Sequence, residues 1–238
     1  MNRVLVLMGA ALALWAAPAQ AQESTDAPTG AFEVSGTVSL TTDYVFRGIS
    51  LSDNEPAVQG SLEVQHKSGI YAGLWGSSIA RFAGTHVETD IYGGWRGSAA
   101  GLDFDLGVVG YVYPGGHGAN YVELAGKAAK TLGPVEAELG AAWAPSQKTI
   151  GGRDNLYLFG SLSSGIPGTP VTITADVGHE KGGMAGPSGK KWDWGLTADY
   201  VRGPVTLSVS YKDSDVRRAL DPDKVARSRV MATVTLSF

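Results

Sequence analysis

The sequence contains no cysteine, so no disulfide holds any part of the folded chain together. Charged residues make up only 18% of it, and the formal net charge of −4 gives no reason to expect nucleic acid as a partner. Beyond residue 21, no apolar run reaches the roughly 18 residues that a membrane-spanning helix requires. These absences exclude a helical membrane protein and a long coiled coil.

The first residues have the pattern of a secretory signal peptide. Arg3 precedes a short apolar run, Val4–Trp15, and the A-x-A sequence Ala19–Ala21 is a typical cleavage site. We expect cleavage directly after this sequence, where the lack of cysteine excludes lipidation; an uncleaved membrane anchor is the alternative. The predicted divisions of the chain are a signal peptide over residues 1–21, a periplasmic lead-in over residues 22–31 and one folded domain over residues 32–238.

Glycine is abundant, at 33 residues, which is about twice its usual share. Between the glycines, apolar side chains alternate with polar or small ones. In Phe32–Thr41 one side carries Phe32, Val34, Gly36, Val38 and Leu40, and the other carries only hydroxyl or carboxylate side chains: Glu33, Ser35, Thr37, Ser39 and Thr41. Such alternation indicates a β-strand with unlike environments on its two faces. The pattern recurs along the chain and predicts about twelve strands, most near the length that crosses a bilayer.

The connections between these strands alternate in length. Short turns such as His66–Gly69 and Arg202–Pro204 alternate with longer polar loops, with the short glycine-rich Pro114–Ala119 as the exception. Outer-membrane barrels have short periplasmic turns and longer external loops. The sequence therefore predicts an all-β fold, a transmembrane antiparallel up-and-down β-barrel of about twelve strands. The longer loops are predicted at Arg47–Pro56, Ser77–His86, Ala144–Asp154, Glu180–Lys191 and Asp213–Ser228.

A soluble β-sandwich also alternates, and the placement of aromatic residues decides against it. Amphipathic rings prefer the two membrane interfaces, whereas a sandwich core would hold them in the middle of its strands. Here the aromatic residues of the apolar faces fall at strand ends, in two belts. The belt at the loop end is predicted to contain Tyr44, Trp143, Trp192, Trp194 and Tyr211, and the belt at the turn end Phe32, Trp95, Tyr200 and Phe238.

If the apolar positions face lipid, the alternate positions line the lumen. More acids than bases occupy those positions, which predicts a preference for cations in a narrow pore. The alternative is that the acids pair with bases or lie at the rims, where salt screens them. The predicted pore-lining and selectivity residues are Glu88, Asp90, Glu123, Asp105, Glu138, Asp199, Arg96 and Lys127.

Two further groups of lumen residues have a predicted role. Arg47, with Asp43, lies where the first strand enters its loop, and that loop could fold inward and constrict the pore, or Arg47 could face lipopolysaccharide phosphate. Several inward tyrosines could form a vestibule for sugars, nucleosides or cationic ligands, or could simply brace the wall. These tyrosines are Tyr92, Tyr111, Tyr113, Tyr121 and Tyr157.

Catalysis and cofactor binding have weaker support in the sequence. A hydrolytic set could be assembled only from Ser77 or Ser78 with His86 and Glu88, and it rests on proximity in sequence alone. The aspartates of Asp213–Asp223 do not have the spacing of a calcium-binding EF-hand loop, and a solvated acidic loop explains them better. We therefore expect no enzyme activity, metal or other cofactor.

Two segments resemble known outer-membrane sequences. The last strand alternates apolar residues up to a terminal Phe238, which resembles the C-terminal signal read by the barrel-assembly machinery. Thr41–Ser78 is similar to the N-terminal signature of the TorF family of porin-like outer-membrane proteins. The matching segments are T-D-Y-x-F-R-G-I-S at Thr42–Ser50, S-D-x-x-P-A-x-Q-G at Ser52–Gly60 and S-G-x-Y-A-G-x-W-G-S at Ser68–Ser77. The resemblance implies a porin role without an assigned substrate.

Together these features predict an outer-membrane porin-like channel for passive diffusion of small hydrophilic solutes. The expected partners are outer-membrane lipid and lipopolysaccharide, the assembly machinery and a small solute, with no nucleic acid; the oligomeric state is open. The alternative is a structural or surface-interaction barrel with a plugged lumen, followed by an outer-membrane hydrolase.

Overall fold

The structure, a computed structural model, describes residues 30–238. The predicted signal peptide and almost all of the predicted lead-in lie outside the described residues. No helix within the described part of the chain is long and apolar enough to cross a membrane.

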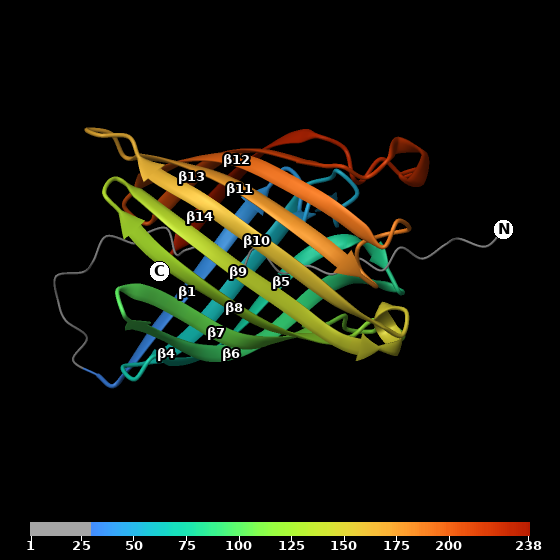
Figure 1. The fold of residues 1–238 in the computed structure, drawn as a ribbon, viewed down its shortest axis with the longest axis horizontal. Helices are drawn as coiled ribbons and strands as arrows, with labels where there is room; N and C mark the ends of the chain where they lie inside the picture. The colour runs from blue at the N-terminus through green and yellow to red at the C-terminus, as the bar shows by residue number, and fades with distance from the viewer. Residues whose placement is uncertain (1–29) are drawn as a thin grey trace.

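Twelve long antiparallel strands close into a barrel, with each strand paired to its neighbours in sequence order (Figure 1). This confirms the predicted fold class. The strands of the barrel are β1 (Phe32–Thr41), β4 (Ala57–His66), β5 (Ile70–Phe82), β6 (Thr85–Ala99), β7 (Leu102–Val112), β8 (Tyr121–Leu132), β9 (Val135–Gln147), β10 (Arg153–Gly165), β11 (Val171–Gly182), β12 (Lys190–Arg202), β13 (Val205–Ser214) and β14 (Arg229–Ser237).

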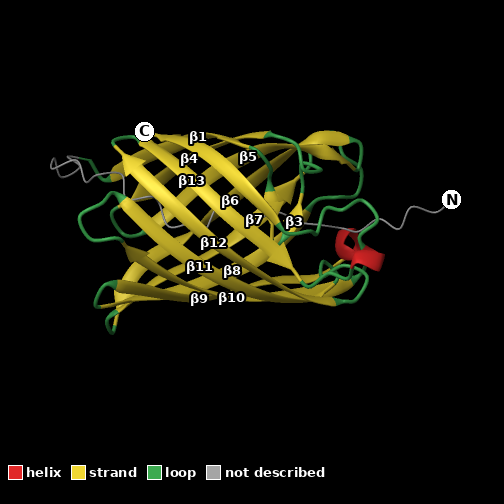
Figure 2. Ribbon diagram, turned by 90° about the horizontal axis from the view of Figure 1, so that it is seen from above, coloured by secondary structure: helices red, strands yellow, loops and turns green. Residues whose placement is uncertain are grey.

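The first and last strands close the sheet. Leu40 of β1 lies opposite Val234 of β14 on one side and opposite Val58 of β4 on the other. Closure leaves no unpaired strand edge, as a lipid environment requires. The strands are inclined to the long axis of the barrel (Figure 2). We call the end with the short turns, such as residues 67–69 and 203–204, the turn end, and the opposite end the loop end.

The outer face of the barrel is apolar, because the apolar set of each alternating pattern is exposed. Leu139 is 73% exposed and Val230 is 71% exposed, although both lie within strands. A soluble protein would bury such residues, whereas a barrel in lipid presents them to acyl chains. The aromatic belts are exposed as predicted, with one exception. Tyr44 is only 3% exposed, because its segment turns into the lumen.

In Ile70–Gly76 both alternate sets contain large apolar residues, so the sequence does not decide which set faces outward. Ile70 and Leu74 face outward, whereas Tyr71 and Trp75 are buried in the lumen. The predicted loop Ser77–His86 is wrong, because β5 and β6 continue past the predicted strand ends and meet at a tight turn formed by Ala83 and Gly84. Both turn residues have positive φ, which suits a two-residue hairpin between right-twisted strands.

Two short strands, β2 (Val45–Phe46) and β3 (Ile49–Ser50), pair with each other and not with the barrel. They lie in residues 42–56, which join the neighbouring strands β1 and β4. Adjacent strands are only about 4.8 Å apart, so this connection contains far more chain than the gap requires. The excess folds back into the lumen at the loop end. We call Val45–Ser50 the inward hairpin. Two single-turn 3-10 helices, η1 (Lys148–Ile150) and η2 (Arg218–Leu220), lie in other loops.

Candidate functional site

The tip of the inward hairpin is the two-residue turn Arg47-Gly48. Both residues have positive φ, 45° for Arg47 and 78° for Gly48, as a type I′ turn requires. Glycine adopts this conformation freely, but arginine does so at a cost of about 1–2 kcal/mol. Backbone strain of this kind persists only where surrounding contacts offset it, so we expect Arg47 to make strong contacts.

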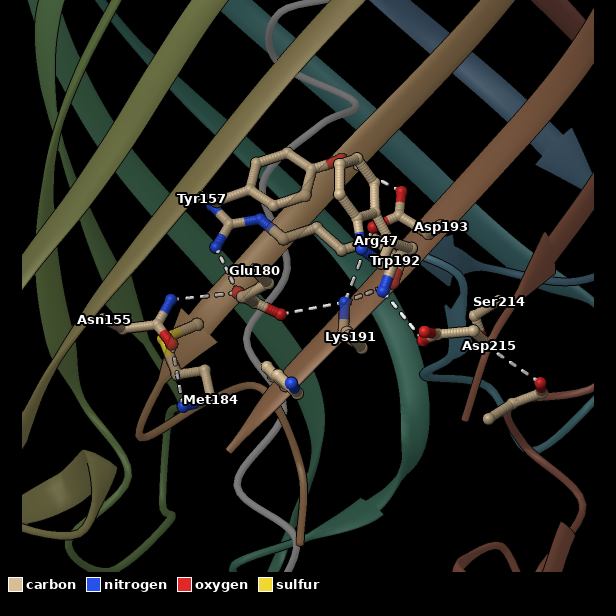
Figure 3. A network of polar contacts seen from close by, with 12 residues as sticks. Arg47, Asn155, Tyr157, Glu180, Met184, Lys191, Trp192, Asp193, Ser214 and Asp215 are labelled. Atoms are coloured by element: carbon tan, nitrogen blue, oxygen red, sulfur yellow. Dashed lines mark hydrogen bonds and ion pairs between the residues drawn. The ribbon is translucent and has the colours of Figure 1, made fainter. Parts of the chain in front are cut away.

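The Arg47 guanidinium lies at the centre of a buried ion-pair network (Figure 3). Its Nη2 donates to Glu123 Oε2 at 2.8 Å, and its Nη1 donates to Glu180 Oε1 at 2.7 Å and to Glu123 Oε1 at 3.1 Å. Phe46 and Tyr157 face the guanidinium plane at 4.5 and 4.4 Å. A planar fork with bidentate and stacking partners is the environment for which arginine is suited and lysine is not.

Lys191 joins the hairpin to the opposite wall. Its Nζ donates to the main-chain oxygen of Arg47 at 2.6 Å and lies 2.8 Å from Glu180 Oε2. Asn155 donates its amide to Glu180 at 2.9 Å, and Tyr157 donates its hydroxyl to Asp193 at 2.9 Å. The network therefore connects the hairpin tip with β8, β10, β11 and β12, across the lumen of the barrel.

The charge on Arg47 is secure in this environment. Burial by itself would lower the pKa of the guanidinium, but the carboxylates of Glu123 and Glu180 raise that pKa well above its ordinary value. Removing one member of a buried ion pair leaves the other charge uncompensated, which costs about 3–5 kcal/mol. The network therefore stabilises the inward position of the hairpin only while all its members are present.

Asp43 holds the base of the hairpin. Its Oδ1 accepts hydrogen bonds from Ser50 at 2.6 Å and Ser52 at 2.8 Å, and its Oδ2 accepts one from Arg229 at 2.6 Å. The hairpin is also fixed by its main chain, because Ser50 N donates to Val225 O at 2.7 Å. The loop between β13 and β14 thus contacts the hairpin, and the segment beyond Ser50 hydrogen-bonds to β5 through Leu51 O and Ala80 N.

A second cluster lies beside the hairpin, and we call it the acid–tyrosine cluster. Its residues come from β6, β8, the end of β7 and the residue that precedes β2. It consists of Glu88, Asp90, Tyr44, Tyr111, Tyr113 and Tyr121. Glu88 and Asp90 are fully buried, and Tyr44 donates its hydroxyl to Glu88 Oε1 at 2.9 Å. Tyr111 and Tyr121 lie opposite each other on β7 and β8 with stacked rings 4.3 Å apart. The cluster fills part of the loop half of the lumen.

The turn half of the lumen is more open and contains its own ion pairs. Arg96 contacts Glu63 and lies 3.0 Å from Asp105. Lys127 lies 2.8 Å from Glu138. Nearer the loop end, Lys212 of β13 pairs with Asp176 of β11. Their side chains are partly exposed, in contrast to those of the loop half. Solvent therefore reaches well into the barrel from the turn end.

The structure separates the predicted site residues into these two halves. The loop half contains the constriction candidates Arg47 and Asp43, the acids Glu88, Asp90 and Glu123, and the tyrosines Tyr111, Tyr113, Tyr121 and Tyr157. These tyrosines are at most 7% exposed, so they pack against the hairpin and line no open vestibule in this state. The turn half contains Arg96, Lys127, Asp105, Glu138 and Asp199, together with Tyr92, whose ring faces that of Tyr71 at 6.2 Å.

Sequence reasoning missed Glu180 and Lys191, because it assigned both to an external loop. The signal was present in the alternation. Glu180 has the same parity as Asp176, an acid on the polar face of its strand that pairs with Lys212, and Lys191 has the same parity as Asp193. Both strands simply continue further toward the loop end than predicted. Phe46 of the hairpin is also buried in the lumen and was not predicted there, whereas Trp75, also buried, lies in the strand whose register the sequence left open.

The residues weighed for catalysis do not form an active site in this structure. Glu88 is fully buried, whereas His86 is exposed, and no hydrogen bond joins His86 to Ser77 or Ser78 in the described chain. Over residues 30–238 no group of three or more His, Asp or Glu side chains is arranged to hold a metal ion.

The C-terminal residue completes the barrel seam. Phe238 N donates to Gly36 O at 3.0 Å, and Gly36 N donates to Phe238 O at 2.8 Å. The Phe238 ring is 69% exposed at the turn end, beside Gly36. A side chain at position 36 would meet this ring at 2.8 Å, so glycine makes room for it. The assembly role that the resemblance implies for Phe238 stays a prediction.

Comparison with known proteins identifies the family of this chain. A family model described as "Bacterial protein of unknown function (Gcw_chp)" matches residues 25–238. The chain belongs to the Gcw_chp family. The family model does not name the TorF family, so that finer assignment stays a prediction. No curated protein gives a significant match to the sequence.

Two solved structures contain barrels similar to this one. A structure described as the KdgM porin in complex with disordered oligogalacturonate matches with a TM-score of 0.58 and 8% identity, covering 86% of this chain and 98% of that one. The NanC porin matches with a TM-score of 0.57 and 10% identity, covering 87% and 99%. At these identities the likeness shows a shared barrel fold. With its apolar outer face and aromatic belts, the chain is an outer-membrane β-barrel.

Proposed function

We propose that this protein is an outer-membrane channel for small hydrophilic solutes, with its loop end outside the cell and its passage restricted by the inward hairpin. The observation that carries the proposal is the contrast between an apolar outer wall and a charged lumen within one closed barrel. The porin fold of its structural neighbours supports the same function.

The turn half of the lumen supports a preference for cations. Its bases Arg96 and Lys127 each contact at least one carboxylate, and Arg96 contacts two. Asp199 has no ion pair in the described chain and accepts a hydrogen bond from Ser208. Excess negative charge along a low-dielectric wall raises the local concentration of cations. Pairing makes this excess smaller than a simple count of inward acids suggests, so we propose a weak preference.

The proposal includes the finer assignments that the sequence suggested. We place the protein in the TorF family on the segments Thr42–Ser50, Ser52–Gly60 and Ser68–Ser77. The first segment contains the inward hairpin and Asp43, and the second contains Ser52, which hydrogen-bonds to Asp43. The densest part of the resemblance therefore coincides with the constriction. The assembly machinery would insert the barrel by reading Phe238, and external loops would meet lipopolysaccharide. No catalytic step forms part of this function.

Burial of Arg47 favours one alternative, a structural or surface-interaction barrel that the hairpin plugs permanently. The two functions differ in conductance. The test is single-channel recording of refolded protein in a planar bilayer under a tenfold KCl gradient, after heat-modifiable migration has shown that the barrel is folded. Discrete steps with a reversal potential of cation sign are expected. Folded protein without steps would establish the plugged barrel, and a reversal potential of anion sign would remove the cation preference.

A charge-removing variant with a matched control sharpens this measurement. Asp199→Asn should move the reversal potential toward zero, because it removes an unpaired lumen charge. Asp154→Asn is the control, since Asp154 is exposed at the loop end, outside the lumen. Equal effects of the two substitutions would show that lumen charge does not determine selectivity.

A further inference from the structure

The acid–tyrosine cluster has an unbalanced charge. Elsewhere in the loop half, each buried carboxylate has a basic neighbour: Glu123 and Glu180 contact Arg47, Asp193 lies 3.6 Å from Lys191, and Asp43 contacts Arg229. Glu88 and Asp90 have no ion pair in the described chain, although both are fully buried. Two carboxylates next to each other in a dry interior repel strongly unless something positive lies between them.

The same cluster contains most of the unsatisfied buried polar atoms of the described chain. Glu88 Oε2, both carboxylate oxygens of Asp90, and the hydroxyls of Tyr113 and Tyr121 have no partner in hydrogen-bonding geometry. Buried oxygens in folded proteins nearly always have partners, and each exception needs a physical explanation. Tyr113 still lies close enough to Glu88 and Tyr121 to interact with both, but neither oxygen of Asp90 has any such neighbour. Asp90 therefore points to a partner that the protein chain does not supply.

The strand pairing places the residues that carry these oxygens next to one another. Asp90 lies opposite Tyr111, and the adjacent inward positions on the same two strands are Glu88 and Tyr113. Tyr121 lies opposite Tyr111 on the next strand. Burial, followed by the charge of Glu88, the interaction of the phenol with Glu88 as a hydrogen-bond acceptor and the charge of Asp90, raises the pKa of Tyr113 well above its ordinary value, so this phenol is neutral and close to both acids. The set therefore consists of two carboxylates and two neutral phenol groups.

We propose that Glu88 and Asp90 bind a small divalent hard cation, with calcium as the best match, together with the hydroxyl oxygens of Tyr113 and Tyr121. Hard cations take oxygen ligands, and two carboxylates neutralise a charge of two. The packed surroundings favour a bare ion over an organic cation, because Tyr44, Tyr111 and Val109 leave the cluster inaccessible to solvent. This site does not depend on the channel proposed above, since a plugged barrel would contain it equally.

The competing explanation is protonation, in which Glu88 and Asp90 stay neutral carboxylic acids. Two acids that share a site often retain protons for this reason. Protonation supplies hydrogen-bond donors within the cluster and needs no ion. The two explanations predict opposite responses to calcium, which makes them separable.

The test uses terbium as the probe, because Tb³⁺ has the ligand preference of Ca²⁺ and emits when nearby tyrosines are excited. The full mature barrel is refolded at pH 8 in uncharged detergent with Tb³⁺ present, so that the ion can enter before the hairpin closes. Saturable tyrosine-sensitised emission that Ca²⁺ displaces is expected. Wild-type protein that folds without such emission would overturn the proposal in favour of protonation.

Variants locate the emission. Asp90→Asn should abolish it, and Tyr113→Phe, which keeps the ring and the charge but removes one oxygen ligand, should weaken Tb³⁺ affinity even if Asp90→Asn folds poorly. Glu136→Gln is the matched control, because Glu136 is an exposed acid at the turn end and should leave emission unchanged. Folding of each variant is checked by heat-modifiable migration. Equal emission from Asp90→Asn, Tyr113→Phe and wild type would place the ion elsewhere and contradict the site.

Discussion

At the scale of single residues, Arg47 shows how a strained backbone and a buried charge can support each other. Its positive φ of 45° is unfavourable for any side chain with a Cβ atom, yet this conformation is what directs the guanidinium between Glu123 and Glu180. Tyr44 beside it has a pKa well above its ordinary value, owing to burial and then to the charges of Glu88 and Asp90, so it remains a hydrogen-bond donor to Glu88.

The first residue-scale prediction concerns Arg47 itself. Arg47→Ala leaves Glu123 and Glu180 without their shared partner, which should weaken the inward position of the hairpin by about 3–5 kcal/mol. Bilayer recordings should then show larger and noisier steps, and the temperature of heat-modifiable unfolding should fall.

Arg47→Lys is the informative companion to this substitution. It keeps the charge but replaces a planar fork with a single ammonium, so it should give an intermediate conductance. Wild-type conductance and unfolding temperature in Arg47→Ala would mean that the ion pairs do not hold the hairpin in place.

At the scale of elements, the inward hairpin depends on backbone fit as much as on charge. Gly48 lies against β12 and β13, and a Cβ atom there would lie 2.8 Å from the Cβ atoms of Asp193 and Ser214. The hairpin therefore enters the lumen only because its second turn residue has no side chain. Its length and position follow from the excess chain between β1 and β4.

We therefore predict that Gly48→Ala displaces the hairpin without any change in charge. Conductance should rise as it does in Arg47→Ala, because the added methyl group collides with the barrel wall and the positive φ disfavours alanine. Gly101→Ala is the matched control, since Gly101 has a similar φ of 72° in a turn but nothing within 4 Å of the added atom. If both substitutions changed conductance equally, backbone strain alone and not the fit of the hairpin would be responsible.

At the scale of the whole molecule, the barrel is stable only when an apolar solvent such as lipid covers its outer face. Leu139 is a suitable probe, because it is 73% exposed and lies within β9, opposite Gly160 on one neighbour and Ala128 on the other. Charge is costly at the middle of a bilayer and much less so at its edges.

Leu139→Arg should lower the free energy of unfolding in lipid vesicles by about 2–4 kcal/mol, and Leu132→Arg by roughly 0–1 kcal/mol. Leu132 is an appropriate control, because it is 56% exposed but ends β8 at the turn end. Denaturant titration in vesicles measures both values. A similar cost at the two positions would show that Leu139 does not lie deeper in the bilayer than Leu132, contrary to what the two aromatic belts indicate.

The sequence by itself determined the wall of this protein. Alternation with a period of two states which side of each strand is apolar, and it does so locally, so the number of strands, their order and the outward position of Leu139 or Trp192 could be predicted without knowledge of distant residues. Apart from Tyr44, which was predicted to face outward, the errors lie at strand ends, because polar and small residues at the loop end continue the lumen face and resemble loop sequence. Glu180 and Lys191 were missed for that reason.

The tertiary structure alone decided what fills the barrel. Whether residues 42–56 fold inward or outward depends on partners that are remote in sequence, such as Glu180 for Arg47, Arg229 for Asp43 and Val225 for Ser50. These contacts exist only after the sheet has closed and brought β11, β14 and the last loop around the hairpin. Local pattern cannot encode them, because burial of a charged loop residue is favourable only when its distant partners are already in place.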